Sequence, residues 1–193
     1  KFGESQDFVY SRSNSPTKQD LEKLMANLEN GKYAYVFSSG MGATNAVLTL
    51  FQSGDHVIVG ADVYGGTYRI IKELYPKFGI DYTFVDTTEL KNIEDVVKEN
   101  TKAIIVETPS NPLMDVTDIK GTVAIAKKHG IITVVDNTFL TPYLQKPLDL
   151  GADIVIHSAT KFLSGHHDII AGVVVTNDEE IGAKIKFAMR TAG

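Results

Sequence analysis

The sequence predicts a three-layer α/β domain in which helices cover both faces of a mostly parallel sheet. Short runs of β-branched residues alternate with longer amphipathic segments along the whole chain. The runs Ala103–Val106, Ile131–Val135 and Ile154–Ile156 are almost wholly apolar, which is typical of strands that are buried on both faces. The 193 residues are 43% hydrophobic and 22% charged, so the chain can bury a sizeable core and is not disordered.

The first helix is predicted from its end signals. Ser15-Pro16 has the pattern of an N-cap followed by proline in the first turn, and Gly31 stands where a C-cap glycine belongs. One face of this helix is marked by Leu21, Leu24, Met25 and Leu28. We then expect a strand over Tyr33–Phe37, a glycine-rich turn at 38–42 and a helix to about Phe51. After a strand over His56–Val59, we expect a helix over Thr67–Phe78, followed by a strand over Tyr82–Val85. In that helix we expect Ile70, Ile71 and Leu74 to face inward.

The second half of the chain continues the same alternation of helices and strands. We expect helices over Ile93–Lys98 and Val116–Lys128, the three apolar strands named above, a last strand over Ile169–Val175 and a helix from near Asp178. The chain stops at Gly193 without a stop signal, so we expect that more protein follows.

Composition narrows the class of protein. Nineteen Lys and Arg residues against 24 Asp and Glu give a net charge of −5, which disfavours sequence-independent nucleic-acid binding. The absence of cysteine excludes disulfides, thiolate nucleophiles and cysteine-based zinc sites. We see neither a membrane-spanning run nor a signal peptide, and we therefore expect a soluble, cytoplasmic protein.

Two charged residues follow predicted strands, where ligands bind in open α/β sheets. Asp136 ends an apolar strand and could hold a protonated ligand nitrogen, or it could cap the next turn. Lys161 lies in Ser158-Ala159-Thr160-Lys161 and could be a Schiff-base amine, or it could be a solvated surface lysine. Ser158 and Thr160 carry hydroxyls that suit phosphate oxygens but also suit ordinary turns.

Other candidates follow earlier strands. Gly40-Met41-Gly42 opens a helix, where free backbone N–H groups bind phosphate, although a plain turn also needs glycine. Tyr64 could stack on a flat ligand ring and handle protons. Asn111 could contact a ring hydroxyl or make an Asn-Pro turn. We predict no metal site, because the adjacent His166 and His167 point in different directions.

Together these stretches resemble the fold-type I pyridoxal-phosphate (PLP) enzymes, and most closely the Cys/Met-metabolism branch that includes cystathionine γ-lyases and γ-synthases. The resemblance covers essentially all 193 residues. It is carried by six motifs in chain order: Tyr10-Ser11-Arg12-Ser13, Ser38-Ser39-Gly40-Met41-Gly42-Ala43, Asp62-Val63-Tyr64-Gly65-Gly66-Thr67, Glu107-Thr108-Pro109-Ser110-Asn111-Pro112, Val135-Asp136-Asn137-Thr138-Phe139 and His157-Ser158-Ala159-Thr160-Lys161.

The resemblance implies PLP as cofactor and a role for each motif. It implies a Schiff base on Lys161, pairing of Asp136 with the pyridine nitrogen, stacking and proton transfer by Tyr64, and contact of Asn111 with the ring hydroxyl. The remaining implied roles concern the phosphate: Gly40, Met41, Ser158 and Thr160 hold it, and Tyr10 and Arg12 reach the phosphate of a neighbouring subunit in a homodimer or homotetramer.

The family also implies the domain organisation and the reaction. Residues 1–15 would form an arm towards the neighbouring subunit, residues 16–193 the PLP-binding domain, and a C-terminal substrate domain would be absent from this chain. The implied reaction is cleavage of a carbon–sulfur bond in cystathionine or a related amino acid by γ-elimination. The alternatives are γ-replacement on an O-acylhomoserine by a cystathionine γ-synthase, and a cofactor-domain fragment without turnover.

The sequence departs from the family pattern at three places. Asn14-Ser15-Pro16 replaces the more usual Gly-Asn-Pro, Gly66 stands where methionine γ-lyases typically have Cys, and His167 replaces a smaller residue.

A nucleotide-binding Rossmann domain is an alternative interpretation of the sequence, because Gly40-x-Gly42 opens a helix and Asp62 has about the spacing of a ribose-binding acid. That reading leaves Lys161 and Asp136 unexplained.

Overall fold

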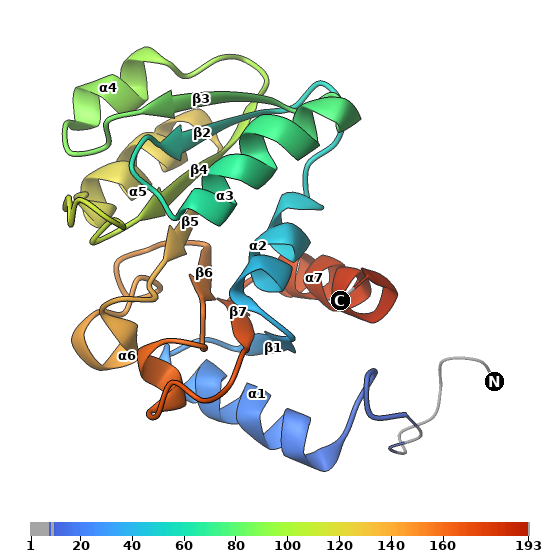
Figure 1. Ribbon diagram of the computed structural model, residues 1–193. Helices are drawn as coiled ribbons and strands as arrows, with labels where there is room; N and C mark the ends of the chain where they lie inside the picture. Colours follow the sequence, from blue (N-terminus) through green and yellow to red (C-terminus); the bar gives the residue numbers. More distant parts are fainter. Residues whose placement is uncertain (1–7, 9, 193) are drawn as a thin grey trace.

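A sheet of seven strands forms the centre of the described part of the chain, which is residue 8 and residues 10–192 of a computed structural model (Figure 1). The strands are β1 (Tyr33–Phe37), β2 (His56–Gly60), β3 (Asp81–Val85), β4 (Thr101–Glu107), β5 (Ile132–Asp136), β6 (Ile154–His157) and β7 (Gly172–Thr176). Their order across the sheet is β1-β7-β6-β5-β4-β2-β3.

Most of the sheet is parallel, which confirms the predicted fold class. Strands β3, β2, β4, β5 and β6 run in parallel, and β7 is antiparallel to both of its neighbours, β1 and β6. Strands β2, β6 and β7 are buried along their whole length, and β4 and β5 are buried except at one or two positions, as their largely apolar sequences require. The carboxyl ends of β4, β5 and β6 therefore meet at one edge of the sheet.

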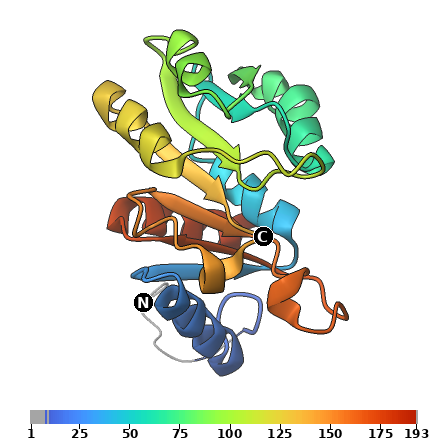
Figure 2. The ribbon, with the colours of Figure 1, turned by 90° about the vertical axis from the view of Figure 1, so that its left-hand side faces the viewer.

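Helices cover both faces of the sheet, so the domain has three layers (Figures 1 and 2). Residues of α2, η1 and α7 join the core on one face, and residues of α1 and α5 join the cores on the other. The helices are α1 (Pro16–Leu28), α2 (Gly40–Leu48), α3 (Gly65–Arg69), η1 (Ile70–Leu74), η2 (Tyr75–Phe78), α4 (Leu90–Asp95), α5 (Ile119–His129), α6 (Thr141–Leu144), η3 (Phe162–Ser164) and α7 (Glu179–Ala192).

The helix ends follow local capping chemistry. The side chain of Ser15 accepts a hydrogen bond from the Lys18 N–H at 3.2 Å, which confirms the predicted start of α1. Ser39 caps α2 in the same way, through its Oγ and the Gly42 N–H at 3.0 Å. These caps fix where each helix begins.

Several predicted boundaries were wrong. The helix expected from Val116 begins only at Ile119, because the Asp118 side chain caps it by accepting from the Gly121 N–H at 3.1 Å. The strand expected from Ile169 begins at Gly172, and Ile170 is 72% exposed. Helix α4 begins three residues before its predicted start.

Two predictions about apolar faces also need correction. Ile71 is buried and Ile70 packs against the core, but Leu74, which was expected to face inward, is exposed. On α1, Met25 is buried, whereas the leucines at 21, 24 and 28 are exposed.

The topology is not that of a Rossmann domain. Gly40 follows β1, which is an edge strand paired antiparallel to β7, whereas the dinucleotide fingerprint needs a parallel βαβ unit at this point. Asp62, the residue with the spacing of a ribose-binding acid, instead uses its carboxylate to accept hydrogen bonds from the Ser110 hydroxyl and from the Leu113 N–H.

Within residues 10–192, no helix is long and apolar enough to span a membrane.

Candidate functional site

A cavity of about 210 Å³ opens at the carboxyl ends of β4, β5 and β6, next to the first turn of α2. It gathers eight of the ten predicted site residues: Gly40, Met41, Tyr64, Asn111, Asp136, Ser158, Thr160 and Lys161. Thr138, Phe139 and Glu107 also line it. Residues separated by more than 100 positions in the sequence thus converge on one site.

Asp136, the last residue of β5, presents a carboxylate to the cavity. Its Oδ1 accepts hydrogen bonds from both the N–H and the hydroxyl of Thr138. Among the described residues, its Oδ2 accepts none. Burial raises the pKa of Asp136, while the Thr138 bonds and the nearby His157 act in the opposite direction. A buried carboxylate with a free oxygen is suited to a cationic partner on a ligand.

Glu107 is a second carboxylate in the cavity, and the sequence reasoning missed it. It is the last residue of β4 and pairs in register with Asp136 on β5. Its Oε2 accepts a hydrogen bond from the Tyr64 N–H at 2.7 Å, and it also accepts one from the Asn111 N–H. Burial, followed by the charge of Asp136, raises the pKa of Glu107 to about 8. The pKa values of both neighbouring carboxyl groups are therefore raised by burial, and the two groups titrate as an interacting pair.

Lys161 lies on the connection that leaves β6 and enters the neighbouring antiparallel strand β7. The Thr160 N–H donates to the Ala171 carbonyl at 3.2 Å, and the Ala171 N–H donates to Thr160 Oγ1 at 3.0 Å. The Lys161 N–H donates to the Ser158 carbonyl at 3.1 Å. These bonds fix the backbone on both sides of Lys161 and leave its amine available at the wall of the cavity.

The first turn of α2 forms a cradle for an anion. Among the described residues, neither the Gly40 N–H nor the Met41 N–H has an acceptor, as expected for the first turn of a helix. A Cβ atom on Gly40 would lie 2.7 Å from Ser158 Cβ and 2.9 Å from its hydroxyl. The glycine thus lets the Ser158 hydroxyl lie directly beside these amides, where all three groups can bind one anion.

The Tyr64 ring lies against Gly66 and Met41. A Cβ atom on Gly66 would come within 2.5 Å of Tyr64 Cε1 and 2.7 Å of Met41 Sδ. The absence of a side chain at position 66 is therefore a condition for the Tyr64 ring to occupy its place. Tyr64 is 46% exposed and lines the cavity, where its ring can stack on a flat ligand.

Two predicted site residues do not line the cavity. Arg12 donates from its guanidinium to the Arg190 carbonyl at 2.7 Å, and its charge lies 5.8 Å from the centre of the Tyr10 ring. Both side chains are exposed.

His167, which differs from the family pattern, does not line the cavity either. Its φ of 55° lies in the left-handed region, and its ring centre is 6.3 Å from that of Phe162.

A larger hollow of about 680 Å³ lies between α2 and α7, but it contains none of the predicted residues and no carboxylate. The 210 Å³ cavity, in contrast, combines an amine, a carboxylate with a free oxygen and a set of amide and hydroxyl donors. That arrangement fits a ligand with an anionic group at one end and a basic nitrogen at the other. PLP has this chemistry, together with an aldehyde that reacts with lysine.

Comparison with known proteins agrees with this chemistry. Residues 1–193 match the family described as Cys/Met metabolism PLP-dependent enzyme. The chain is 50% identical over 193 residues to a protein named cystathionine gamma-lyase from Bacillus subtilis (strain 168), covering 100% of this chain and 51% of that protein. It is 52% identical over 191 residues to one named cystathionine beta-lyase from Lactococcus lactis subsp. cremoris (strain MG1363), covering 99% of this chain and 50% of that protein.

A solved structure is similar over the same extent. The crystal structure of cystathionine gamma-lyase from Lactobacillus plantarum complexed with L-serine has a TM-score of 0.94 and 47% sequence identity. The match covers 98% of this chain and 50% of that chain. The chain thus spans about half the length of the relatives that it matches.

Proposed function

This chain belongs to the Cys/Met metabolism PLP-dependent enzymes, and from that premise we propose that the protein is a carbon–sulfur lyase acting by γ-elimination on cystathionine or a related sulfur amino acid. The observation that carries the proposal is the convergence of Lys161, Asp136 and the α2 amides on one cavity. PLP requires an amine, a carboxylate and an anion cradle, and these residues supply all three.

Each part of the cavity has a role in holding the cofactor. Lys161 Nζ is the point of covalent attachment, and Asp136 Oδ2, free among the described residues, pairs with the protonated ring nitrogen. Gly40, Met41, Ser158 and Thr160 hold the phosphate, Asn111 contacts the ring hydroxyl and Tyr64 stacks on the ring. When bound, PLP supplies a conjugated cationic ring that withdraws electron density from the carbon atoms of an attached amino acid.

The chain's own residues then move the protons. With PLP and a substrate amino acid bound, Lys161 Nζ would take a proton from the substrate Cα and assist removal of one from Cβ. The Cγ–S bond breaks with its electron pair on sulfur, and the Tyr64 hydroxyl supplies the proton that the leaving thiol needs. Asp136 keeps its charge beside the ring nitrogen throughout, which maintains the electron withdrawal on which both deprotonations depend.

Two alternatives lead to different products. A cystathionine γ-synthase would join a thiol to the Cγ of an O-acylhomoserine by replacement. A cofactor-domain fragment would bind PLP without turnover. The similar proteins described above carry γ-lyase and β-lyase names at nearly equal identity, so product analysis has to distinguish the reactions.

The first test is attachment of the cofactor. The purified protein with added PLP should absorb visible light, and borohydride reduction should fix the label on the peptide that contains Lys161. Lys161→Ala should take up no reducible label and should have no turnover. Labelling of another lysine, or normal turnover by Lys161→Ala, would overturn the assignment.

The second test is the product from cystathionine. Cleavage on the Cγ side of sulfur gives cysteine, 2-oxobutyrate and ammonia, whereas cleavage on the Cβ side gives homocysteine, pyruvate and ammonia. We expect cysteine and 2-oxobutyrate. Formation of cystathionine from cysteine and an O-acylhomoserine, without 2-oxobutyrate, would instead establish the synthase.

The exposed side chains of Tyr10 and Arg12 support a shared active site. Because Tyr10 and Arg12 lie outside their own chain's cavity, we propose that they reach the cofactor phosphate of a neighbouring subunit in a homodimer or homotetramer. Mixing inactive Lys161→Ala with inactive Arg12→Ala tests this, because hybrids would contain one intact site and regain activity. Absence of any recovery in hybrids that do form would refute it.

The remaining predictions about organisation also stay proposals. Of the arm expected over residues 1–15, residues 1–7 and 9 lie outside the described residues, and the rest precedes α1. A C-terminal substrate domain would accord with relatives that are about twice as long as the matched region. The cytoplasmic location predicted from the sequence can be tested by cell fractionation.

A further inference from the structure

We propose that Glu29, His157 and Asn137 form a buried positioning unit that fixes the spacing between Asp136 and Ser158 and thereby sets how well the cavity fits its cofactor. None of the three lines the cavity, so none is a catalytic residue. The proposal rests on the proposed function, because it assigns these residues a role towards bound PLP.

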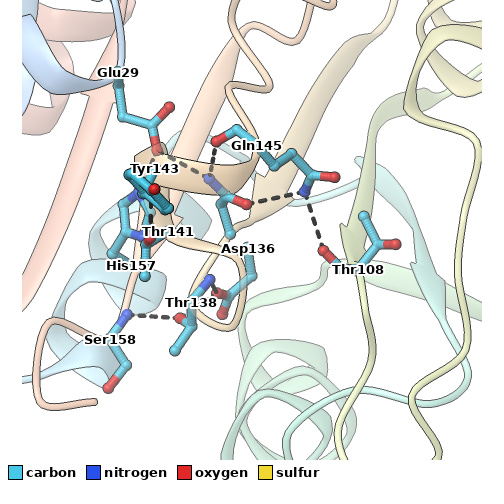
Figure 3. A network of polar contacts seen from close by, with 10 residues as sticks. Glu29, Thr108, Asp136, Thr138, Thr141, Tyr143, Gln145, His157 and Ser158 are labelled. Atoms are coloured by element: carbon cyan, nitrogen blue, oxygen red, sulfur yellow. Dashed lines mark hydrogen bonds and ion pairs between the residues drawn. The ribbon is translucent and has the colours of Figure 1, made fainter. Parts of the chain in front are cut away.

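Glu29 brings the end of α1 into contact with the strand ends (Figure 3). It is the C-cap residue of α1, and its side chain is completely buried. Its Oε1 lies 2.5 Å from Nε2 of His157, the last residue of β6, and accepts a hydrogen bond from Asn137 Nδ2 at 3.1 Å. One carboxylate oxygen thus joins the residue before Ser158 to the residue after Asp136.

Asn137 extends the connection to a third strand end. Its Nδ2 donates to the Gln145 carbonyl at 2.8 Å, and its Oδ1 accepts from Gln145 Nε2 at 2.9 Å. Gln145 Nε2 also donates to the Thr108 carbonyl at 3.1 Å, just beyond β4 (Figure 3). The unit therefore contacts the ends of β4, β5 and β6, each of which supplies cavity residues.

The cavity side of the same strand ends has its own connection. Thr138 bonds to Asp136 Oδ1 through its N–H and its hydroxyl, and the Ser158 N–H donates to Thr138 Oγ1 at 2.8 Å. Side chains alternate between the faces of a strand, so Asn137 and His157 lie on the face opposite to Asp136 and Ser158. The two strand ends are thus joined on both faces, which resists sliding of β5 relative to β6.

The ligand explains why this spacing matters. Asp136 holds the ring nitrogen and Ser158 holds the phosphate, and both groups belong to one small aromatic molecule with few rotatable bonds. A site of this kind needs its contacts held to within about 0.5 Å. A small slide between β5 and β6 would force the ligand to lose one contact while keeping the other.

Stability alone is a poor reason for this arrangement. Glu29 Oε2 and His157 Nδ1 are buried and have no hydrogen-bond partner within the described part of the chain. Buried ionisable groups with incomplete bonding destabilise a fold relative to apolar residues of the same volume. An apolar packing of α1 on the sheet would serve the fold better, so the polar unit is better explained by its effect on the cavity.

The experiment compares Glu29→Ala and Glu29→Gln in the intact protein. Alanine removes both bonds to Oε1, whereas the glutamine carbonyl can still accept them. We expect Glu29→Ala to weaken PLP binding on the order of tenfold and to shift the absorption maximum of the bound cofactor. Glu29→Gln should stay within about threefold of wild type and keep the wild-type spectrum.

His56→Gln is the matched control. His56 is also completely buried and bonded through both ring nitrogens, to Thr101 at 2.8 Å and to Thr83 at 2.9 Å. It lies at the opposite ends of the strands, at the start of β2. We expect this variant to lower thermal stability without changing PLP affinity or the spectrum. If Glu29→Ala behaves in the same way, the unit is merely structural and the proposal is wrong.

Gln145→Ala provides a second measurement if Glu29→Ala does not fold. Gln145 is only partly buried, and its loss breaks the bonds to Asn137 Oδ1 and the Thr108 carbonyl. We expect a smaller loss of PLP affinity with the same spectral shift, and unchanged affinity would overturn the proposal. Failure of the proposed function is distinguishable, because then wild type would not bind PLP or Asp136→Asn would bind it unchanged.

Discussion

Replacing Glu107 by glutamine should change how the stability of the cofactor-free chain depends on pH. Burial and the neighbouring Asp136 raise the pKa of Glu107 from 4.5 to about 8 in the folded chain. Between these values the folded state keeps a proton that the unfolded state releases, so stability falls as pH rises. Below about pH 4.5 both states are protonated, and the effect is absent.

The size of the effect follows from the same values. The difference of about 3.5 pH units, at about 1.4 kcal/mol per unit, gives an upper limit of about 5 kcal/mol lost by pH 8. Glutamine is neutral in both states and can still accept from the Tyr64 N–H. We therefore expect Glu107→Gln to be nearly neutral at about pH 5 and clearly more stable than wild type at about pH 8.

Urea unfolding followed by circular dichroism, repeated from about pH 5 to about pH 8, measures this difference. Burial also raises the pKa values of Glu22 and Asp153, but both residues remain in the variant, so subtraction isolates the pair at the cavity. Glu99→Gln, at an exposed position, is the control and should run parallel to wild type. If Glu107→Gln also runs parallel, Glu107 is not protonated in the folded chain and the reasoning fails.

Three further predictions concern the site and its frame. Asp136→Asn should keep the native circular dichroism spectrum but lose most of kcat, because an amide cannot hold the ring nitrogen protonated; full activity would refute the pairing. Gly40→Ala should weaken PLP binding at least about tenfold, since its Cβ would lie 2.7 Å from Ser158 Cβ. Gly65→Ala, where a Cβ meets nothing within 4 Å, should leave PLP affinity unchanged. Ser15→Ala should lower the free energy of unfolding by about 1 kcal/mol through loss of the α1 cap, measured by urea unfolding.

The sequence predicted the sheet well, because its central strands are unbroken apolar runs and burial dictates their structure. Strand β1 has the predicted bounds, β5 is shifted by one residue at each end, and β6 is one residue longer than predicted. One error in the sheet occurs where apolar residues lie outside it. Ile169 and Ile170 extend the apolar run that contains β7, yet they are exposed in the connection before it.

Within the site, the sequence analysis identified two charged residues that differ clearly from their neighbours, Lys161 and Asp136. It missed a third charged residue, Glu107, which does not differ in this way. Lys161 and Asp136 interrupt apolar or small-residue stretches, which drew attention to them. Glu107 also ends a strand, and its register pairing with Asp136 is the signal that could have revealed it. That pairing needs the strand order β4-β5, which the sequence alone did not provide.

The antiparallel placement of β7 has a consequence for how this site could diversify. Both ends of the connection that carries Lys161 are held at one edge of the sheet, through the bonds between Thr160 and Ala171. Its tip, which includes the exposed Phe162 and Ile170, can then accept insertions or new side chains without displacing the lysine backbone. Mutational libraries confined to residues 165–170 would sample new cavity mouths while the bonds from Ser164 to the Lys161 carbonyl keep the point of attachment in register.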